Sequence, residues 1–202
     1  MLSFDLRTAL PALNYKLMTG LITPRPIALV TSLDLDGRVN AAPFSYFNAF
    51  GSDPAIVVLG IGNRPGTNVA KDTAANIAAT HEFVVHLVDE AIARQMNVCS
   101  TQFPHGVNEI EQAGFTPIAS VVVKPPRIAE SAVHFECVED QRLVIGNNRL
   151  IIGRVLMAHV REGILNPENQ HVIDGAFYPL GRMHGRGWYT RTEDQFEMNR
   201  PE

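Results

Sequence analysis

The chain of 202 residues has no large surplus of charge of either sign and no long apolar run. Its 17 Lys and Arg residues stand against 21 Asp and Glu residues, for a formal net charge of −4. A basic excess is the mark of a nucleic-acid binder, so we expect no nucleic-acid partner. No run of about 18 apolar residues occurs, so we expect no membrane partner. The first ten residues carry Asp5 and Arg7 where a secretion signal would be apolar, which favours a cytoplasmic protein.

Cysteine is scarce, with Cys99 and Cys137 far apart and in no CxxC pair. This spacing excludes a disulfide framework and the usual zinc patterns, so we expect two reduced core thiols and no metal site. His134 and Glu136 alternate along an expected strand and would share one face. Two such groups do not make a metal site by themselves.

The common catalytic motifs are also missing. The sequence contains no GxSxG, HExxH, Walker A or GxGxxG pattern. Glycines recur between Gly181 and Gly187, but without the strand-to-helix context that a phosphate loop needs. We therefore expect no catalytic side chain of the acid, base or nucleophile type.

Turn-forming residues are abundant instead, with 15 Gly and 13 Pro in a chain that is 46% hydrophobic. Apolar β-rich runs predict strands at 25–33, 39–50, 55–61, 82–88, 118–123, 132–139 and 150–160, with 143–145 before a turn at 147–148. Helical spacing predicts helices at 3–19 (interrupted at Pro11), 68–80, 90–98 and 109–113. Strands that follow one another through short turns indicate a mainly β fold with peripheral helices, an antiparallel barrel in a single domain.

The segment from Arg64 to Thr73 has the character of a phosphate site. A strand leads into Pro65-Gly66, then into a helix whose start is flanked by Arg64 and Lys71. Free N–H groups at a helix start and two cations suit a phosphate dianion. The alternative is an ordinary helix start with two surface cations.

The segment from Asn40 to Asn48 alternates small, aromatic and amide residues around Pro43. Because proline cannot donate a ladder hydrogen bond, Pro43 predicts a bulge or an edge, where free backbone groups could meet a flat heteroaromatic ligand. The alternative is an edge strand with a bulge and no ligand.

The order of these pieces resembles that of a known family. The pieces are Thr23-Pro-Arg-Pro-Ile-Ala-Leu-Val-Thr-Ser32, Asp36-Gly37, Asn40-Ala-Ala-Pro-Phe-Ser-Tyr-Phe-Asn48, Ser52-Asp-Pro54, Lys71-Asp-Thr73, Glu82-Phe-Val-Val85, Phe135-Glu-Cys137 and Ile152-Gly-Arg154. Together with a tail of Arg182, Tyr189 and Arg200-Pro201, they are similar to the flavin reductase-like family of FMN-binding split β-barrels. The resemblance covers about residues 20–201.

The resemblance implies one split-barrel domain over 1–202, with 1–20 as an N-terminal extension and 178–202 as a C-terminal tail. It implies a homodimer that holds FMN near the subunit interface and uses NADH or NADPH. Carried over to this sequence, it implies a cofactor-binding set in three groups. Near the ring lie Thr31, Ser32, Ala42, Pro43, Phe44, Ser45, Tyr46 and Asn48; at the phosphate lie Arg64, Lys71 and Thr73; in the tail lie Arg182 and Tyr189.

Three functions stay open at this point. The first is an NAD(P)H-dependent flavin reductase, which needs no protein acid or base because FMN accepts hydride at its own N5 atom. It would have a monooxygenase or another redox protein as a possible partner. The second is a flavoredoxin-type FMN electron carrier without NAD(P)H turnover, and the third is a degenerate split barrel that binds another ligand. His184 is either a contact for the nicotinamide nucleotide or an exposed loop residue.

Overall fold

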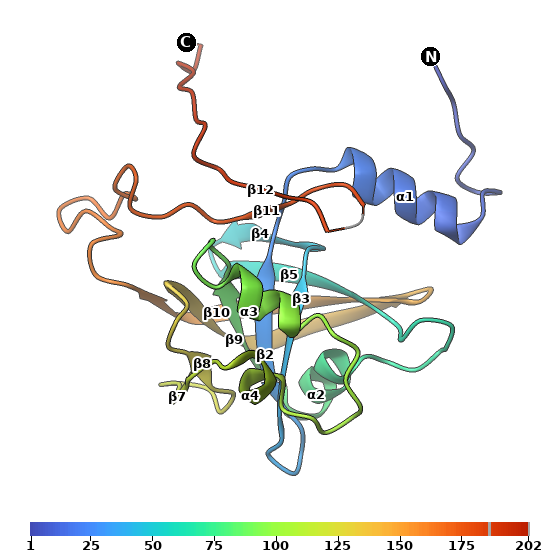
Figure 1. Ribbon diagram of the computed structural model, residues 1–202, viewed down its shortest axis with the longest axis horizontal. Helices are drawn as coiled ribbons and strands as arrows, with labels where there is room; N and C mark the ends of the chain where they lie inside the picture. Colours follow the sequence, from blue (N-terminus) through green and yellow to red (C-terminus); the bar gives the residue numbers. More distant parts are fainter. Residues whose placement is uncertain (186, 202) are drawn as a thin grey trace.

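The computed structural model describes residues 1–185 and 187–201 (Figure 1). Seven strands form one antiparallel sheet in the order β3-β2-β6-β9-β10-β5-β4. They are β2 (Ala28–Leu33), β3 (Val39–Phe44), β4 (Phe47–Ser52), β5 (Ala55–Gly62), β6 (Glu82–Leu87), β9 (Val133–Ile145) and β10 (Asn148–Val160). The helices are α1 (Pro11–Leu21), α2 (Asp72–Thr80), α3 (Ala93–Val98) and α4 (Glu109–Ala113). The mainly β prediction is confirmed.

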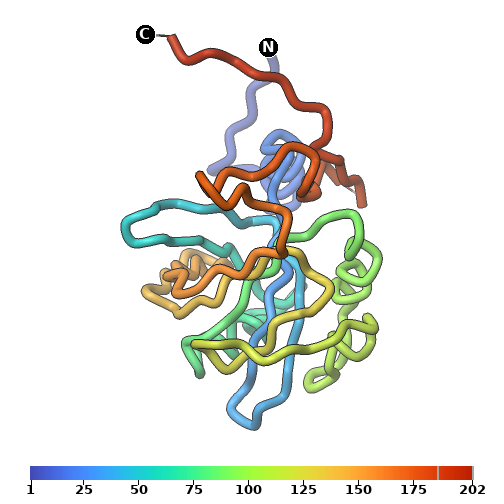
Figure 2. Tube along the Cα trace, turned by 90° about the vertical axis from the view of Figure 1, so that its left-hand side faces the viewer, coloured from blue at the N-terminus to red at the C-terminus, as the bar shows by residue number. Residues whose placement is uncertain are grey.

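Short strands complete the fold. β1 (Arg25–Pro26), β11 (Gly181–Arg182) and β12 (Tyr189–Thr190) form a small three-stranded sheet, and β7 (Pro117–Ile118) pairs with β8 (Arg127–Ile128). Because β1 pairs with β11, the segment that follows α1 is joined directly to the C-terminal tail. Figures 1 and 2 both show α1 and the tail together above the large sheet.

The large sheet closes because its two edge strands are consecutive in the chain. β3 and β4 lie at opposite ends of the strand order, and only Ser45 and Tyr46 separate them. Pro43 lies within β3 opposite Leu29, on the edge strand, where its missing N–H leaves no ladder bond broken. The chain therefore links one edge of the sheet to the other through a two-residue break.

Alternate side chains of the sheet enter two separate cores. Ala28 and Val30 of β2 join the inner core, where α2 contributes Ile77. Leu29 belongs to the outer core, which α3 and α4 cover. Gly153 of β10 faces the inner core, and a Cβ atom there would lie 2.3 Å from Cζ of the fully buried Phe83. The barrel is thus packed tightly enough that one β10 position excludes any side chain.

Several predicted boundaries are wrong, each for a local physical reason. The first helix begins at Pro11 and does not run from residue 3, because proline needs no N–H partner in the first turn. The strand predicted for 39–50 is two strands, β3 and β4. α2 begins at Asp72 and not at 68, since Arg64–Val69 forms a turn closed by Arg64 N–H to Val69 O at 2.9 Å.

The other differences lie in the second half of the chain. α3 begins at Ala93 and not at 90, and the segment 143–145 is the end of the continuous strand β9. Residues 119–123 are not a strand, because the N–H groups of Val121, Val122 and Val123 bond to the buried carboxylate of Glu136. The C-terminal tail, for which no strand was predicted, contains the short strands β11 and β12.

Candidate functional site

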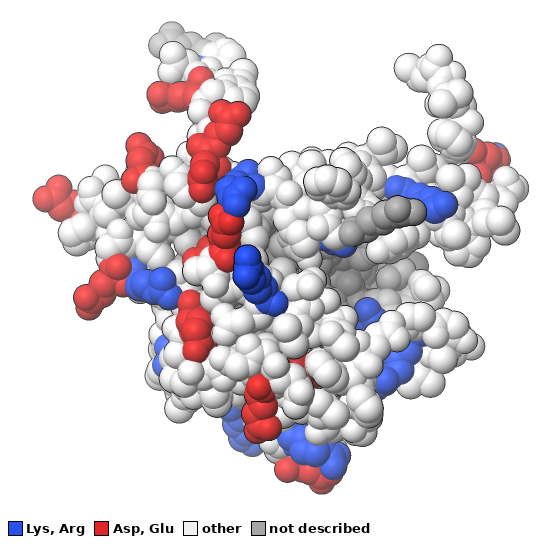
Figure 3. All heavy atoms as spheres, viewed as in Figure 1, with Lys and Arg blue, Asp and Glu red and all other residues white. Residues whose placement is uncertain are grey.

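Two adjoining cavities lie between the barrel, α1 and the start of α2. The larger has a volume of about 660 Å³ and the smaller about 450 Å³, and they share Pro43, Phe44 and Lys71. Figure 3 shows a hollow between the raised α1 helix and the barrel, with basic side chains around it. Arg25, Lys71 and Arg182 line the larger cavity, and no Asp or Glu is among its lining residues in the described part of the chain. An acidic chain therefore presents a basic cavity.

The break between β3 and β4 forms the wall that both cavities approach. The last β2–β3 pair is Ala28 with Phe44 and the first β4–β5 pair is Phe47 with Leu59, so Ser45 and Tyr46 lie outside both sets of pairs. Tyr46 O accepts a hydrogen bond from Gly60 N–H at 2.7 Å. A Cβ atom on Gly60 would lie 3.0 Å from Cβ of Tyr46, so glycine allows this close approach.

Lys71 lies at the N-cap of α2, and no side chain caps this helix start. Its ammonium lies 5.9 Å from the centre of the Phe44 ring, and partial burial lowers the pKa of Lys71. Lys71 nevertheless remains exposed to solvent, which limits this effect of burial. No carboxylate pairs with Lys71 among residues 1–185 and 187–201. An uncapped helix start beside an unpaired cation favours an anion.

Arg64 and Thr73 line the smaller cavity but already have partners within the protein. Arg64 Nη2 lies 2.5 Å from Oδ1 of Asp72, which also lies 3.1 Å from His105 Nδ1. The Thr73 hydroxyl is buried and accepts a hydrogen bond from Asn40 Nδ2 at 2.9 Å. A phosphate at this end would therefore meet Lys71 as the cation that is not already paired.

Arg25 is a buried residue of the larger cavity that we did not predict as a site residue. It is 6% exposed, and its guanidinium donates to Thr19 O at 2.7 Å and to Ile22 O at 2.8 Å. It also donates to Ser45 Oγ and Met183 O, both at 3.3 Å. Burial lowers the pKa of Arg25; the nearby Tyr46 raises it, and Arg182 lowers it. The signal in the sequence was an arginine between two prolines, Pro24 and Pro26; nothing marked α1 as a cavity wall.

Of the predicted residues, nine line these cavities: Ala42, Pro43, Phe44, Ser45, Tyr46, Arg64, Lys71, Thr73 and Arg182. The structure does not bring the other four to either cavity. Thr31 and Ser32 are fully buried, with Thr31 Oγ1 donating to Pro126 O at 2.6 Å and Ser32 Oγ accepting from Asn76 at 3.2 Å. We therefore leave these two out of the proposed contact set.

Asn48 and Tyr189 also lie outside the lining. Asn48 is an exposed residue of β4, and its side chain accepts a hydrogen bond from the next residue's N–H at 2.9 Å. Tyr189 lies in the tail strand β12, and its ring centre is 4.7 Å from the guanidinium carbon of Arg182. Tyr189 therefore contacts Arg182, which lines the larger cavity, but does not line that cavity itself. His184 is exposed in the tail loop.

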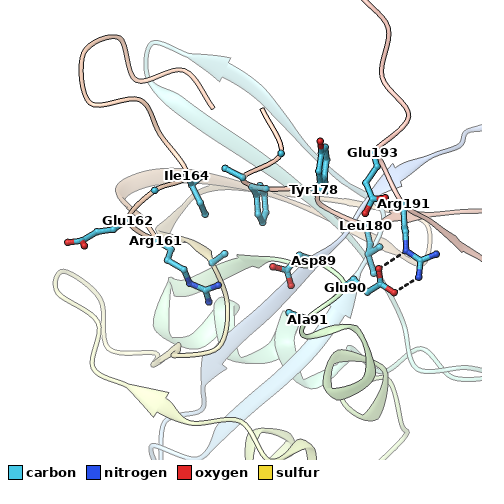
Figure 4. Close-up of a pocket in the computed structure, with 15 residues that line it drawn as sticks. Asp89, Glu90, Ala91, Arg161, Glu162, Ile164, Tyr178, Leu180, Arg191 and Glu193 are labelled. Atoms are coloured by element: carbon cyan, nitrogen blue, oxygen red, sulfur yellow. Dashed lines mark hydrogen bonds and ion pairs between the residues drawn. The ribbon is translucent and has the colours of Figure 1, made fainter. Parts of the chain in front are cut away.

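A third cavity, of about 320 Å³, is separate from these two (Figure 4). It contains none of the predicted site residues. Its acidic and basic side chains are mixed, and Glu90 forms a two-bond ion pair with Arg191. Four acidic residues stand against two arginines in its lining, so this cavity suits an anionic ligand less well than the basic one does.

Both cysteines are buried and free, and burial raises the pKa of Cys99 to about 12 and that of Cys137 further. The prediction that they are core thiols is confirmed. Within the described residues no group of three metal-ligating side chains comes together. No helix in that part of the chain is long and apolar enough to cross a membrane.

Comparison with known proteins places this geometry in context. The Flavin reductase like domain matches residues 19–181. The structure of nitrilotriacetate monooxygenase component B from Bacillus cereus is similar, with 35% identity, a TM-score of 0.92, and 98% of each chain covered. The 2-nitrobenzoate 2-nitroreductase NbaA of Pseudomonas fluorescens has 34% identity and a TM-score of 0.88, over 99% of this chain and 96% of its own.

A split barrel domain protein from Shewanella frigidimarina shares the fold at 16% identity, with a TM-score of 0.83 and all of both chains covered. The similarity at this low identity concerns the fold alone. The prediction of a split β-barrel is confirmed.

Proposed function

This chain belongs to the flavin reductase-like domain family, and from that premise we propose that it binds FMN across the two adjoining cavities and reduces it with NADH or NADPH. The phosphate would lie at the start of α2 and the ring along Pro43–Tyr46. FMN supplies the hydride chemistry, so the protein must bind, orient and charge-stabilise the cofactor. Because the cofactor supplies the reactive atom, the absence of the common catalytic motifs from the sequence is consistent with this function.

One observation carries the proposal: Lys71, which pairs with no carboxylate of the described residues, lies at an uncapped helix start that adjoins a break in the sheet. Lys71 and the free N–H groups of the first turn of α2 would hold the phosphate. The backbone of Ser45 and Tyr46, which lies outside the strand pairs, would meet the polar edge of the ring. Arg25 and Arg182 supply positive charge in the larger cavity, which favours a ring that becomes more negative on reduction.

A second candidate function is the direct reduction of an aromatic acid. The relative from Pseudomonas fluorescens is a 2-nitrobenzoate 2-nitroreductase. The larger cavity here has cations and no acid among its described lining residues, which suits a carboxylate. The relative from Bacillus cereus is a monooxygenase component. Delivery of reduced FMN to a monooxygenase partner therefore remains part of the first proposal.

We further propose a cytoplasmic homodimer. Exposed apolar side chains occur on β4, β9 and β10, at Phe50, Leu143, Val144, Ile145 and Leu156. Exposed apolar side chains on several strands are candidates for an interface between subunits. Sedimentation analysis tests the dimer, and Leu156→Glu should shift it to the monomer.

The test of function is an absorbance spectrum of the purified protein, followed by FMN titration and by NADH or NADPH oxidation with FMN present. We expect tight FMN binding and turnover with at least one nucleotide. Binding without turnover would support the electron-carrier alternative, and no binding would support the degenerate barrel. Anaerobic turnover with 2-nitrobenzoate in place of oxygen distinguishes the second candidate function from the first.

A further inference from the structure

Arg25 combines deep burial with the absence of any acidic partner. Its four acceptors, Thr19 O, Ile22 O, Ser45 Oγ and Met183 O, are all neutral oxygens. No carboxylate pairs with it in the described part of the chain. Arginine stays protonated in proteins even where burial lowers its pKa, so the charge remains. A buried charge costs free energy unless its hydrogen bonds or a ligand compensate it.

The four acceptors belong to three different walls of the larger cavity. Thr19 and Ile22 are at the carboxyl end of α1, where the last carbonyl groups lack helical partners. Ser45 is in the break between β3 and β4, and Met183 is in the tail loop after β11. Guanidinium has five N–H donors in one plane, so one side chain holds all three walls. Lysine has a single nitrogen and no such plane.

The backbone of Arg25 also joins the segment after α1 to the tail. Its Cα is the β-sheet partner of Arg182, the second cation of the cavity. The two like charges therefore lie on neighbouring strands beside the cavity, and neither has an acidic partner among the described residues. An anion in the cavity would relieve their repulsion.

We infer that Arg25 is a positioning residue of this site: it fastens α1 and the tail to the strand break, and its charge, which no carboxylate of the described residues neutralises, makes the cavity bind reduced FMN more tightly than oxidised FMN. The second half rests on the proposed function, whereas the first half concerns the protein without ligand. Arg25 would consequently set the distances between α1, the strand break and the tail loop, which are the walls that contact a molecule in the larger cavity.

The first test uses the ligand-free protein. Chymotrypsin cleaves after Trp188, which is 64% exposed in the tail. We expect Arg25→Met to raise the rate of this cleavage roughly tenfold or more, since hydrogen bonds to a charged group are lost. Arg25→Lys should raise it less. Arg94→Met, an exposed arginine of α3, is the matched control and should cleave at the wild-type rate. Equal rates for Arg25→Met and wild type would overturn the fastening role.

The second test measures the dissociation constants of oxidised and reduced FMN. We expect the ratio of the Kd of oxidised FMN to the Kd of reduced FMN to fall at least tenfold in Arg25→Met. A tenfold fall corresponds to a decrease of about 30 mV in the two-electron potential of the bound cofactor. Arg25→Lys keeps the charge and should keep the ratio within about threefold. A wild-type ratio in Arg25→Met would overturn the electrostatic role.

The two tests keep the two proposals apart. If the wild-type protein binds no FMN, the proposed function and the electrostatic role fail, while the cleavage rates still decide the fastening role. If Arg25→Met does not fold, Arg25→Lys decides: faster tail cleavage with an unchanged ratio supports the inference. A rate of tail cleavage in Arg25→Lys equal to that of the wild type, or a fall of more than about threefold in the ratio of the two dissociation constants, contradicts the inference.

Discussion

Replacing Lys71 with methionine should weaken the binding of FMN but not that of riboflavin. The two ligands share the ring and the ribityl chain, and only FMN carries a phosphate. Methionine keeps an unbranched apolar side chain that can lie over Phe44 and removes the charge. Since no described carboxylate pairs with Lys71, the substitution leaves no acidic partner behind. Any change in affinity therefore reports the interaction with the ligand.

The magnitude follows from the position of Lys71 at the cavity mouth. Two unit charges 4 Å apart interact by about 4 kcal/mol at the effective dielectric constant of a protein surface. Because Lys71 is exposed to solvent, screening reduces this value, and we expect a loss of about 1–2 kcal/mol of binding free energy. This corresponds to a rise in the Kd of FMN of about 5- to 30-fold. The Kd of riboflavin should change less than about twofold.

The assay is the change of flavin fluorescence on titration with protein, at low and at high salt. Lys124→Met removes an exposed lysine away from both cavities and is the matched control. The difference between wild type and Lys71→Met should shrink at 1 M salt, where screening acts over about 3 Å. If the affinities for FMN and riboflavin fall equally, or neither falls, the phosphate does not lie at Lys71.

Two further predictions concern stability. Gly153→Ala places a Cβ atom 2.3 Å from the Phe83 ring and should lower the free energy of unfolding, measured by urea denaturation, by about 1–3 kcal/mol. The control is Gly20→Ala in α1, where nothing lies within 4 Å, and it should be neutral or stabilising. An unchanged free energy of unfolding in Gly153→Ala would contradict the tight packing. His86 is fully buried with a pKa lowered to about 3, mainly by burial, so folding excludes its charged form. Its contribution is complete above pH 6.5 and decreases by up to about 1.4 kcal/mol per pH unit as the pH falls towards 3. His86→Gln should flatten this part of the stability profile, and an equally steep profile would refute the assignment.

The sequence predicted those elements whose signals are local. α4 was predicted at Glu109–Ala113 with Gly114 ending it, and Gly114 adopts φ 67°, the left-handed value that favours glycine. The apolar, β-rich runs at 25–33 and 82–88 likewise predicted strands, and β2 and β6 are buried over most of their length. In each case neighbouring residues determine the structure, so the pattern was sufficient.

The errors arise where the partners of a segment are distant in sequence. Val121–Val123 is a β-branched run that predicts a strand, yet its N–H groups bond to Glu136. The break at Ser45–Tyr46 follows from closure of the sheet, which the alternation over 39–50 does not reveal. Arg25 went unnoticed as a site residue because its partners come from positions 19, 22, 45 and 183.

The acceptors of Arg25 also bear on how this site can change among relatives. Three of the four are main-chain oxygens, which every amino acid supplies. The side chains of α1 and of the tail loop can therefore be exchanged while both segments stay attached. The family match covers residues 19–181, and several residues that line the larger cavity lie outside it: Pro11, Asn14, Tyr15, Met18, Arg182, Met183 and Gly185. A chimera that keeps this barrel and takes both ends from a relative should retain the phosphate end and acquire the relative's choice of second substrate.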